Sequence, residues 1–324
     1  MNRCPLCNGK GEIWQKMTKE KQLQGYRHMY DEEIKPEMFS LDYALFKCQN
    51  CNLVYADPLV AGNDEFYTWV TNHEGYYSTK EIPRWEWEET VSYMQRNNIK
   101  SILEIGCGVG DFLEFCQEKI SDVECVGIDM TKSSCDKCLA KGLNVFCGTI
   151  EDYVKKYPNK KYDIVVSFHC LEHVQNPKQF TDEMFMLCKE DSVCMNSFPY
   201  SDIHIEPWVD CNNLPPHHMT RWCAKSCKEL AKMTNANVEM VSPMFHSVYS
   251  NAIRMLSYLW FPLYECDSLN KGILIKKCFE HPFQVIKEFV RSARRDFIVA
   301  STEIGGKPKR RRASQVILIV LRRK

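Results

Sequence analysis

The sequence lacks the features that would direct a protein to nucleic acid, into a membrane or out of the cell. It has 42 basic and 42 acidic residues, so its formal net charge is zero, and no overall field attracts it to polyanions. No apolar run approaches the ~20 residues that span a bilayer, and the first residues do not resemble a secretory signal peptide. We therefore expect a cytoplasmic protein. Its 324 residues suffice for one core and a small additional domain.

Cysteine, in contrast, is abundant, with 18 residues. In a chain without a secretion signal, thiols serve as metal ligands or as small core residues. Four of them form two C-x-x-C pairs, which can supply the four thiolates of a closed, structural zinc site. We predict that this zinc site consists of Cys4, Cys7, Cys48 and Cys51. The alternative is four unrelated buried cysteines.

Two other cysteine pairs lie in segments that we expect to be helical. Cys135 and Cys138 form a third C-x-x-C without a partner pair, and Cys223 and Cys227 are spaced one helical turn apart. We predict that all four are core residues rather than metal ligands.

The most informative stretch is a glycine-rich turn, EIGCGVG, at residues 104–110. The apolar residues 99–103 before it predict a strand, and the amphipathic residues 112–116 after it predict a helix. Glycines let the backbone approach a ligand closely, and the helix offers free N–H groups. The third glycine comes one residue too early for a dinucleotide-binding fingerprint, and Glu104 ends the strand.

This stretch resembles motif I of class I S-adenosylmethionine (SAM) methyltransferases. Three later segments resemble further motifs of that family in the same order: residues 123–130, 145–152 and 162–174. The resemblance covers about residues 95–245 and the last strand. It implies an α/β, Rossmann-like fold with a seven-stranded, mostly parallel sheet whose last hairpin is antiparallel.

The resemblance also implies where SAM binds. Glu104 and the glycines shape the methionine pocket, Asp129 accepts hydrogen bonds from the ribose diol, and Ile150 and Glu151 flank the adenine. Tyr76 and Tyr77 resemble the tyrosine pair of a lid over the site, and the equal alternative is that this aromatic segment is a packed connector between the two domains. The full predicted cofactor-binding set is Glu104, Gly106, Cys107, Gly108, Gly110, Asp129, Met130, Ile150, Glu151, Ser167, His169 and Tyr77.

Two further strings resemble bacterial methyltransferases that act on sugars and small metabolites. Residues 51–58, CNLVYADP, are similar to the CxxCGLVYxxP that opens those proteins, although Asn52 replaces the glycine and predicts a slightly different turn. Residues 213–222, NLPPHHMTRW, resemble a loop that faces the acceptor in the same group. Arg221 in this loop is expected either to hold an acceptor phosphate or to pair with a local carboxylate.

Histidine is the expected general base, because it titrates near neutral pH. His217 and His218 are the main candidates, and the alternative is that one caps the next helix while the other is solvated. His169, after the fourth strand, and Tyr200, after the fifth, are further catalytic candidates. A less favoured alternative places Mg²⁺ near Glu172 and His173.

These features predict five regions. A zinc-binding, ribbon-like domain spans 1–60, linker and lid helices span 61–98, and the SAM-binding core spans 99–245. A helical insertion spans 246–313, and the last core strand spans 314–324. Within the insertion, residues 283–299 suggest an amphipathic helix that packs on the core, on another subunit or on a membrane. The basic run 307–312 is interpreted as a solvated hairpin loop rather than an RNA contact.

The sequence therefore predicts a SAM-dependent methyltransferase with a structural zinc ion. The expected acceptor is a small molecule, a sugar or nucleotide-linked sugar, methylated at oxygen or carbon. One alternative is an RNA methyltransferase, but the fourth strand ends in SFHC at residues 167–170 instead of the NPPY type of motif. Another is a non-catalytic SAM-fold module, which the intact Glu104, glycines and Asp129 disfavour. RNA and membranes are not expected partners, and the oligomeric state is left open.

Overall fold

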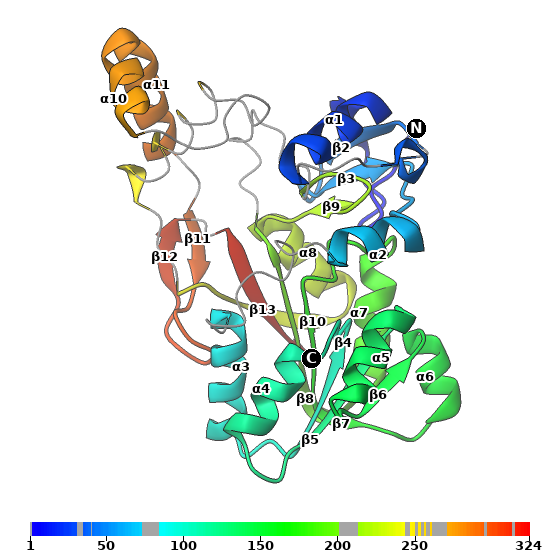
Figure 1. The fold of residues 1–324 in the computed structure, drawn as a ribbon. Coiled ribbons are helices and arrows are strands. Elements are labelled where there is room, and N and C mark those ends of the chain that lie inside the picture. Colours follow the sequence, from blue (N-terminus) through cyan, green and yellow to red (C-terminus); the bar gives the residue numbers. More distant parts are fainter. Residues whose placement is uncertain are drawn as a thin grey trace.

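The computed structural model describes most of the chain and places it in an N-terminal sheet, a large central sheet and C-terminal helices (Figure 1). The described residues are 2–30, 35–39, 41–72, 84–200, 213–243, 247–249, 252–253, 256, 260, 271–294, 297–312 and 315–324. Among them, no helix is long and apolar enough to cross a membrane.

The central sheet has seven strands in the order β10-β13-β8-β7-β4-β5-β6. The five strands from β8 to β6 run parallel, whereas β13 is antiparallel to both of its neighbours. This arrangement confirms the predicted fold class. The strands are β4 (Ser101–Ile105), β5 (Glu124–Asp129), β6 (Val145–Cys147), β7 (Tyr162–Phe168), β8 (Cys188–Pro199), β10 (Ala236–Val241) and β13 (Val316–Arg323).

Helices cover both faces of this sheet, as parallel strands require. Helices α3, α4 and α5 contribute to the apolar core on one face, and α6, α7 and α8 to the core on the other. Local sequence sets their starts: Thr149 and Asp152 form a capping box at α6, and Asn176 caps α7. The helices are α3 (Trp85–Arg96), α4 (Asp111–Lys119), α5 (Lys132–Ala140), α6 (Ile150–Lys156), α7 (Pro177–Met186) and α8 (Ala224–Met233).

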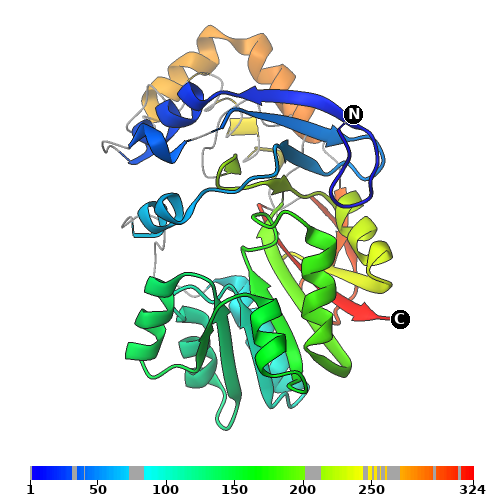
Figure 2. The ribbon, with the colours of Figure 1, turned by 90° about the vertical axis from the view of Figure 1, so that its right-hand side faces the viewer.

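The N-terminal sheet has four antiparallel strands, in the order β1-β2-β3-β9, and its last strand comes from the middle of the chain. Its strands are β1 (Gly11–Met17), β2 (Tyr43–Cys48), β3 (Val54–Asp57) and β9 (Thr220–Arg221). Helix α1 (Lys19–Tyr30), a 3₁₀ turn (Pro36–Met38) and helix α2 (Asp64–Asn72) accompany it. Figure 2 shows this sheet, with its blue strands, above one end of the central sheet. Residues 213–223 thus join the two parts.

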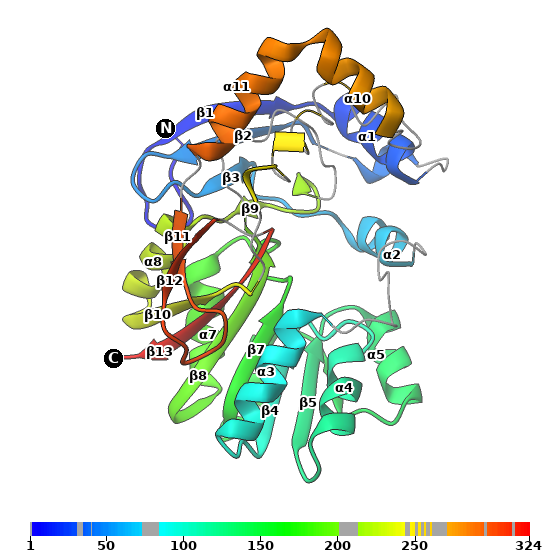
Figure 3. The same cartoon turned by 90° about the vertical axis from the view of Figure 1, so that its left-hand side faces the viewer.

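The C-terminal region contains helices α10 (Lys271–Glu280) and α11 (Pro282–Ala293), which project from the central sheet (Figure 3). The predicted helix over 283–299 is wrong in its last part, because β11 (Phe297–Ala300) pairs there with β12 (Lys309–Arg312). In β11, Ile298 and Ala300 are buried while Val299 is 54% exposed, and this alternation is that of a strand. The basic run is therefore partly a strand rather than a hairpin loop, and the insertion is not purely helical.

Smaller differences concern the ends of elements. The hydrophobic pattern of residues 238–245 predicts a strand that reaches Phe245, but β10 ends at Val241. The pattern of residues 192–198 predicts a strand from Ser192, but β8 begins at Cys188. Cys223 precedes α8 as its N-terminal capping residue, so only Cys227 of that pair lies in the helix. Cys135 and Cys138 lie in α5 and are buried, as predicted.

Candidate functional site

The glycine turn, residues 106–110, links β4 to α4 at the carboxyl end of the parallel strands. Its three glycines have φ angles of +73°, +53° and +83°, a region that side chains with a Cβ rarely adopt. A Cβ on Gly106 would also lie 2.1 Å from the Cys170 sulfur. The turn therefore requires glycine for its shape and its close packing, as the sequence pattern suggested.

Asp129 ends β5 and lies against this turn. Its carboxylate accepts backbone N–H bonds from Gly108 and Thr131, each at 2.8 Å. Burial raises the pKa of Asp129, and these two N–H groups oppose that effect. Each oxygen accepts one of these bonds and keeps capacity for a second, so the oriented carboxylate can bind a diol. The neighbouring Met130 is 75% exposed beside it.

Glu104, near the end of β4, is a buried carboxylate that lacks a hydrogen bond to one of its oxygens among the described residues. Only 4% of the residue is exposed, and its Oε2 has no hydrogen-bond partner among the described residues. Burial, together with the charge of Asp129, raises its pKa well above the usual range. A cationic ligand would offset both effects. This pair of acids beside a glycine turn therefore fits a ligand that carries positive charge and a ribose.

The other predicted cofactor-binding residues differ in burial. Cys107 and Ile150 are buried, and Ile150 is the first residue of α6. Ser167 is buried at the end of β7, and its Oγ has no hydrogen-bond partner in the described structure. Glu151 is exposed and pairs with Lys155 at 2.8 Å. Tyr77 lies outside the described residues, as does Tyr76.

His169 lies directly after β7, between two acids. Its φ of +54° is unusual for a residue with a side chain. Its Nε2 is 3.1 Å from Glu86 Oε1, and its Nδ1 is 3.4 Å from Glu172 Oε1. Burial lowers the pKa of His169, but Glu172 and Glu86 raise it, to a net value of about 9. A protonated imidazole cannot accept a proton, which disfavours His169 as the general base.

The charged His169 predicts a pH dependence of stability. Its pKa rises from about 6.5 to about 9 in the folded state, so its ion pairs stabilise the fold fully below pH 6.5 and are lost as the pH rises through 9. The free energy of unfolding in urea should therefore fall over this interval. The same titration on His169→Gln should lack this component, and an identical slope in both proteins would contradict the assignment.

His217 and His218 are both buried, with 3% and 8% exposed. The alternative in which one caps a helix and the other is solvated is therefore wrong. They stack on each other with ring centroids 4.6 Å apart, and the ring of His173 lies 4.6 and 4.7 Å from theirs. Burial lowers the pKa of His173 and, together with the other histidines, lowers that of His218 further. We call these three residues the histidine cluster.

Two other residues of the predicted site have structural contacts. The Tyr200 hydroxyl accepts a bond from the Ala224 N–H at 2.9 Å, at the start of α8. It therefore supports a helix terminus, which disfavours the predicted proton-transfer role. Arg221 lies in β9 with its guanidinium over the Trp14 ring, 5.4 Å from the centroid. Burial lowers its pKa to about 9.

Residues that the sequence analysis did not single out complete the site. Glu86 comes from α3 and Tyr67 from α2, so no motif links either to His169 or to the histidine cluster. The Tyr67 hydroxyl donates to the His217 carbonyl at 3.2 Å and lies 3.3 Å from His173 Nδ1. The only sequence signal for Tyr67 is its place in an aromatic-rich stretch.

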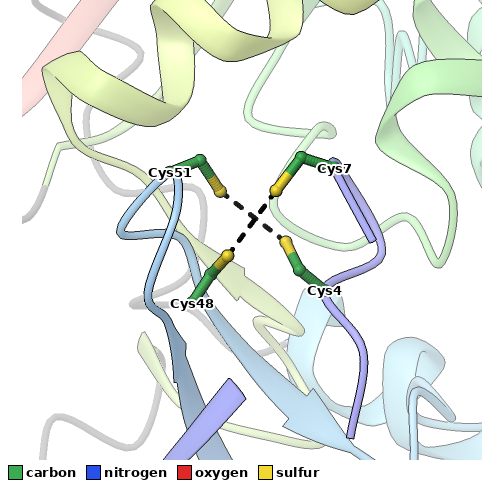
Figure 4. Close-up of side chains that lie close together, drawn as sticks. All are labelled: Cys4, Cys7, Cys48 and Cys51. Atoms are coloured by element: carbon green, nitrogen blue, oxygen red, sulfur yellow. Dashed lines mark hydrogen bonds between the residues drawn. The ribbon is translucent and has the colours of Figure 1, made fainter. Parts of the chain in front are cut away.

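The four cysteines of the two C-x-x-C pairs converge, as Figure 4 shows. Their sulfurs all lie within 4.8 Å of one another, and the Cys4–Cys51 and Cys7–Cys48 distances are both 3.6 Å. Tetrahedral zinc with Zn–S bonds of about 2.3 Å would separate its sulfurs by about 3.8 Å. The four thiols could therefore hold zinc with little adjustment.

The two knuckles have matching turns. Asn8 follows Cys7 and Asn52 follows Cys51, with φ angles of +56° and +61°. Asparagine tolerates this left-handed conformation better than most residues. Asn52 therefore adopts a left-handed conformation like that of Asn8, one that glycine also adopts readily.

Comparison with known proteins identifies the central region as methyltransferase-like. Residues 88–209 match the family model described as methionine biosynthesis protein MetW. The chain is 34% identical to malonyl-acyl-carrier-protein O-methyltransferase 2 of Ilyobacter polytropus over 121 residues, which is 36% of this chain and 46% of that protein. It is 31% identical to ajmaline N-methyltransferase of Rauvolfia serpentina over 94 residues, 26% of this chain and 31% of that protein. The chain thus spans less than half the length of these curated relatives.

A solved structure of a SAM-dependent methyltransferase from Archaeoglobus fulgidus aligns over 73% of this chain and 94% of its own, with 17% identity and a TM-score of 0.45. The strand order, with β13 antiparallel between β8 and β10, and the sequence relatives together establish that this chain has the class I SAM-dependent methyltransferase fold.

Proposed function

We propose that the protein transfers a methyl group from SAM to a small-molecule acceptor. The observation that carries this proposal is the buried Glu104, whose Oε2 has no hydrogen-bond partner among the described residues, beside the glycine turn and the oriented Asp129. SAM carries an ammonium and a sulfonium, which suit two acids in a buried site, and a ribose, which suits Asp129. The names of the sequence relatives, all methyltransferases, support the same activity.

We further propose that the acceptor is a sugar or nucleotide-linked sugar, methylated at oxygen or carbon. The resemblance of residues 51–58 and 213–222 to sugar-modifying enzymes supports this class. The proposal disfavours RNA because the basic strand β12 lies far from the glycine turn. Strand β12 pairs with β11, and Ser301, the residue after β11, bridges to Val241 of the edge strand β10. In the sheet order, three strands separate β10 from β4 and the glycine turn.

A hydroxyl or carbon acid must lose a proton when it is methylated. We assign the handling of this proton to the histidine cluster rather than to His169, because burial lowers the pKa of His173 and His218 whereas Glu172 and Glu86 raise the pKa of His169. The cluster is fixed near the carboxyl end of β7: the backbone N–H groups of Met219 and Thr220 donate to the Glu172 carbonyl at 2.8 and 3.0 Å. This anchors the 213–221 segment next to the residues that follow β7.

Removing either His217 or His218 should therefore impair turnover without affecting SAM. We expect His217→Ala and His218→Ala to lower kcat by about 10²- to 10⁴-fold and to leave the dissociation constant of SAM within about threefold. Steady-state kinetics and calorimetry measure the two effects. The matched control is His281→Ala, which changes the histidine that precedes α11. Full turnover in both cluster variants would show that other residues handle the proton.

We also propose that Cys4, Cys7, Cys48 and Cys51 hold a structural zinc ion. The convergence of their sulfurs supports this proposal. The thiols belong to the same apolar cluster as Trp222 and Phe198, which extends into the central sheet. A zinc ion here would therefore brace the N-terminal sheet, and through β9 the segment that carries His217 and His218.

The direct test of the cofactor assignment is calorimetry with SAM and with its demethylated product. The proposal expects about one binding site per chain for each ligand. A folded protein that binds neither ligand would refute it.

A further inference from the structure

The histidine cluster brings three imidazole rings close enough together to share one bound ion. One ring nitrogen of each of His173, His217 and His218 lies within 4.8 Å of one nitrogen of each of the others. Three imidazoles buried this closely cannot all be protonated, because their charges would repel one another in a medium of low polarity. They therefore place several nitrogen lone pairs in one small volume.

Hydrogen bonds fix the tautomers of two of these rings. The His173 Nδ1–H donates to the His217 carbonyl at 2.6 Å, and the His218 Nδ1–H donates to Asn213 Oδ1 at 3.0 Å. In a neutral imidazole, a protonated Nδ1 leaves the lone pair on Nε2. Metal-binding histidines are held in this way, with the non-ligating N–H donated to a carbonyl or amide oxygen.

Glu172 gives a second, independent indication. The residue is 1% exposed, and neither of its carboxylate oxygens accepts a hydrogen bond from the described residues. The protonated His169 lies 3.4 Å from it on one side but is shared with Glu86 at 3.1 Å, so the two carboxylates carry one more negative charge than His169 balances. On the other side, His218 Nε2 lies 3.8 Å from Glu172 Oε1. A neutral Nε2 lone pair opposite a carboxylate oxygen leaves no hydrogen between them. A cation bound by the histidines would satisfy both groups.

We propose that His173, His217 and His218 bind a divalent transition-metal ion of the zinc or cobalt type, separate from the four-cysteine site. Three imidazoles with one open position are a ligand set of catalytic zinc sites, and imidazole suits zinc, cobalt and nickel better than magnesium. This differs from the Mg²⁺ alternative weighed from the sequence, since nitrogen replaces oxygen in the ligand set. Glu172 is the neighbouring charge that balances the ion.

The metal site deepens the proposed function and rests on it for its role in catalysis. An acceptor hydroxyl that takes the open position has its pKa lowered by the ion. Its proton passes to the nearby Glu172 carboxylate and then to solvent. The oxygen forms a bond to the SAM methyl carbon as the carbon–sulfur bond breaks, and the electron pair stays on sulfur, which becomes a neutral thioether. In this form of the proposal the three histidines act as metal ligands, and Glu172 rather than a free imidazole accepts the proton.

The test is metal content after loading. The full-length protein is incubated with excess ZnSO₄, desalted and analysed for zinc by mass spectrometry. We expect about two zinc ions per chain in the wild type, and about one in His173→Ala and in His218→Asn. His169→Gln, a matched control that removes a nearby histidine outside the cluster, should keep both ions. One ion in the folded wild type, or two in every variant, would overturn the site.

A second measurement does not depend on the folding of a variant. In the wild type titrated with Co²⁺, one equivalent should give the sulfur-to-metal and ligand-field bands of the cysteine site, and a second equivalent should add ligand-field bands of a nitrogen-bound ion without further sulfur-to-metal absorption. Visible absorption that stops changing after one equivalent, with the sulfur-to-metal bands fully developed, would overturn the proposal. The two proposals remain distinguishable: a one-metal protein that methylates its acceptor refutes only the metal site, whereas a two-metal protein that does not bind SAM refutes only the proposed function.

Discussion

Asp129→Ala is expected to weaken SAM binding by well over about tenfold, on the scale of about 1.5–3 kcal/mol for hydrogen bonds to a charged group. The substitution removes the proposed ribose acceptor. It also frees the Gly108 N–H, which the carboxylate holds at 2.8 Å, and so loosens the glycine turn. Titration calorimetry measures the change directly.

Asp136→Ala provides the control for this experiment. Asp136 lies in the neighbouring helix α5 and pairs with the exposed Lys132, so its loss should leave SAM affinity unchanged. If Asp129→Ala binds SAM as the wild type does, the assignment of the ribose to this residue is wrong.

Cys48→Ser is expected to have the largest effect on stability. It removes one of four predicted zinc ligands, and structural zinc in small domains contributes about 10–16 kcal/mol of binding free energy at neutral pH. Cys48 is fully buried and belongs to the core cluster shared with Trp222. We therefore expect loss of the cysteine-bound zinc, a melting temperature lower by more than about 10 °C, and loss of methyl transfer through disorder of the β9 segment.

The matched control is Cys278→Ser, a cysteine on α10 that lies outside the four-sulfur group. It should retain the zinc content and the melting temperature of the wild type. A Cys48→Ser protein with unchanged metal content and melting temperature would show that the four thiols are simply buried cysteines.

The fold could be predicted from the sequence because its information is local. The glycine turn, the acid at Asp129 and the apolar strands stand in a fixed order along the chain, and each strand expected in the central sheet is present. The two C-x-x-C pairs could be recognised for the same reason, since each is a short turn whose residues are close in the sequence. The asparagines at 8 and 52 adopt left-handed angles, which asparagine tolerates better than most residues.

The proposed proton-handling site could be predicted only in part, because its residues come from distant segments of the chain. His217 and His218 stood out beside two prolines, but their burial depends on α2, on Glu172 and on residues 213–221 docking together. Glu86 lies more than eighty positions before His169 in the chain, so no local pattern predicts the contact between them. The contact of Tyr200 is hidden from the sequence for a related reason: its hydroxyl accepts a hydrogen bond from the start of α8, which strand patterning does not reveal.

The C-terminal region shows the limit of periodicity over short runs. Residues 283–293 form the expected helix, but Phe297–Ala300 continue as a strand because a partner exists at Lys309–Arg312. The partner strand is basic, and its charge favoured the interpretation of residues 307–312 as a solvated loop. Pairing between strands is a long-range property, and it overrode the local pattern.

The most direct test of the proposed activity is a methyl-transfer assay with labelled SAM, purified protein and host-cell extract separated into small-molecule and RNA fractions. The proposal predicts label in small, anionic material that is sensitive to phosphatase and resistant to nuclease, and mass spectrometry would then identify the acceptor. Label confined to nuclease-sensitive material would contradict the proposal, and would point instead to the basic strand β12 and the N-terminal sheet as RNA-binding elements.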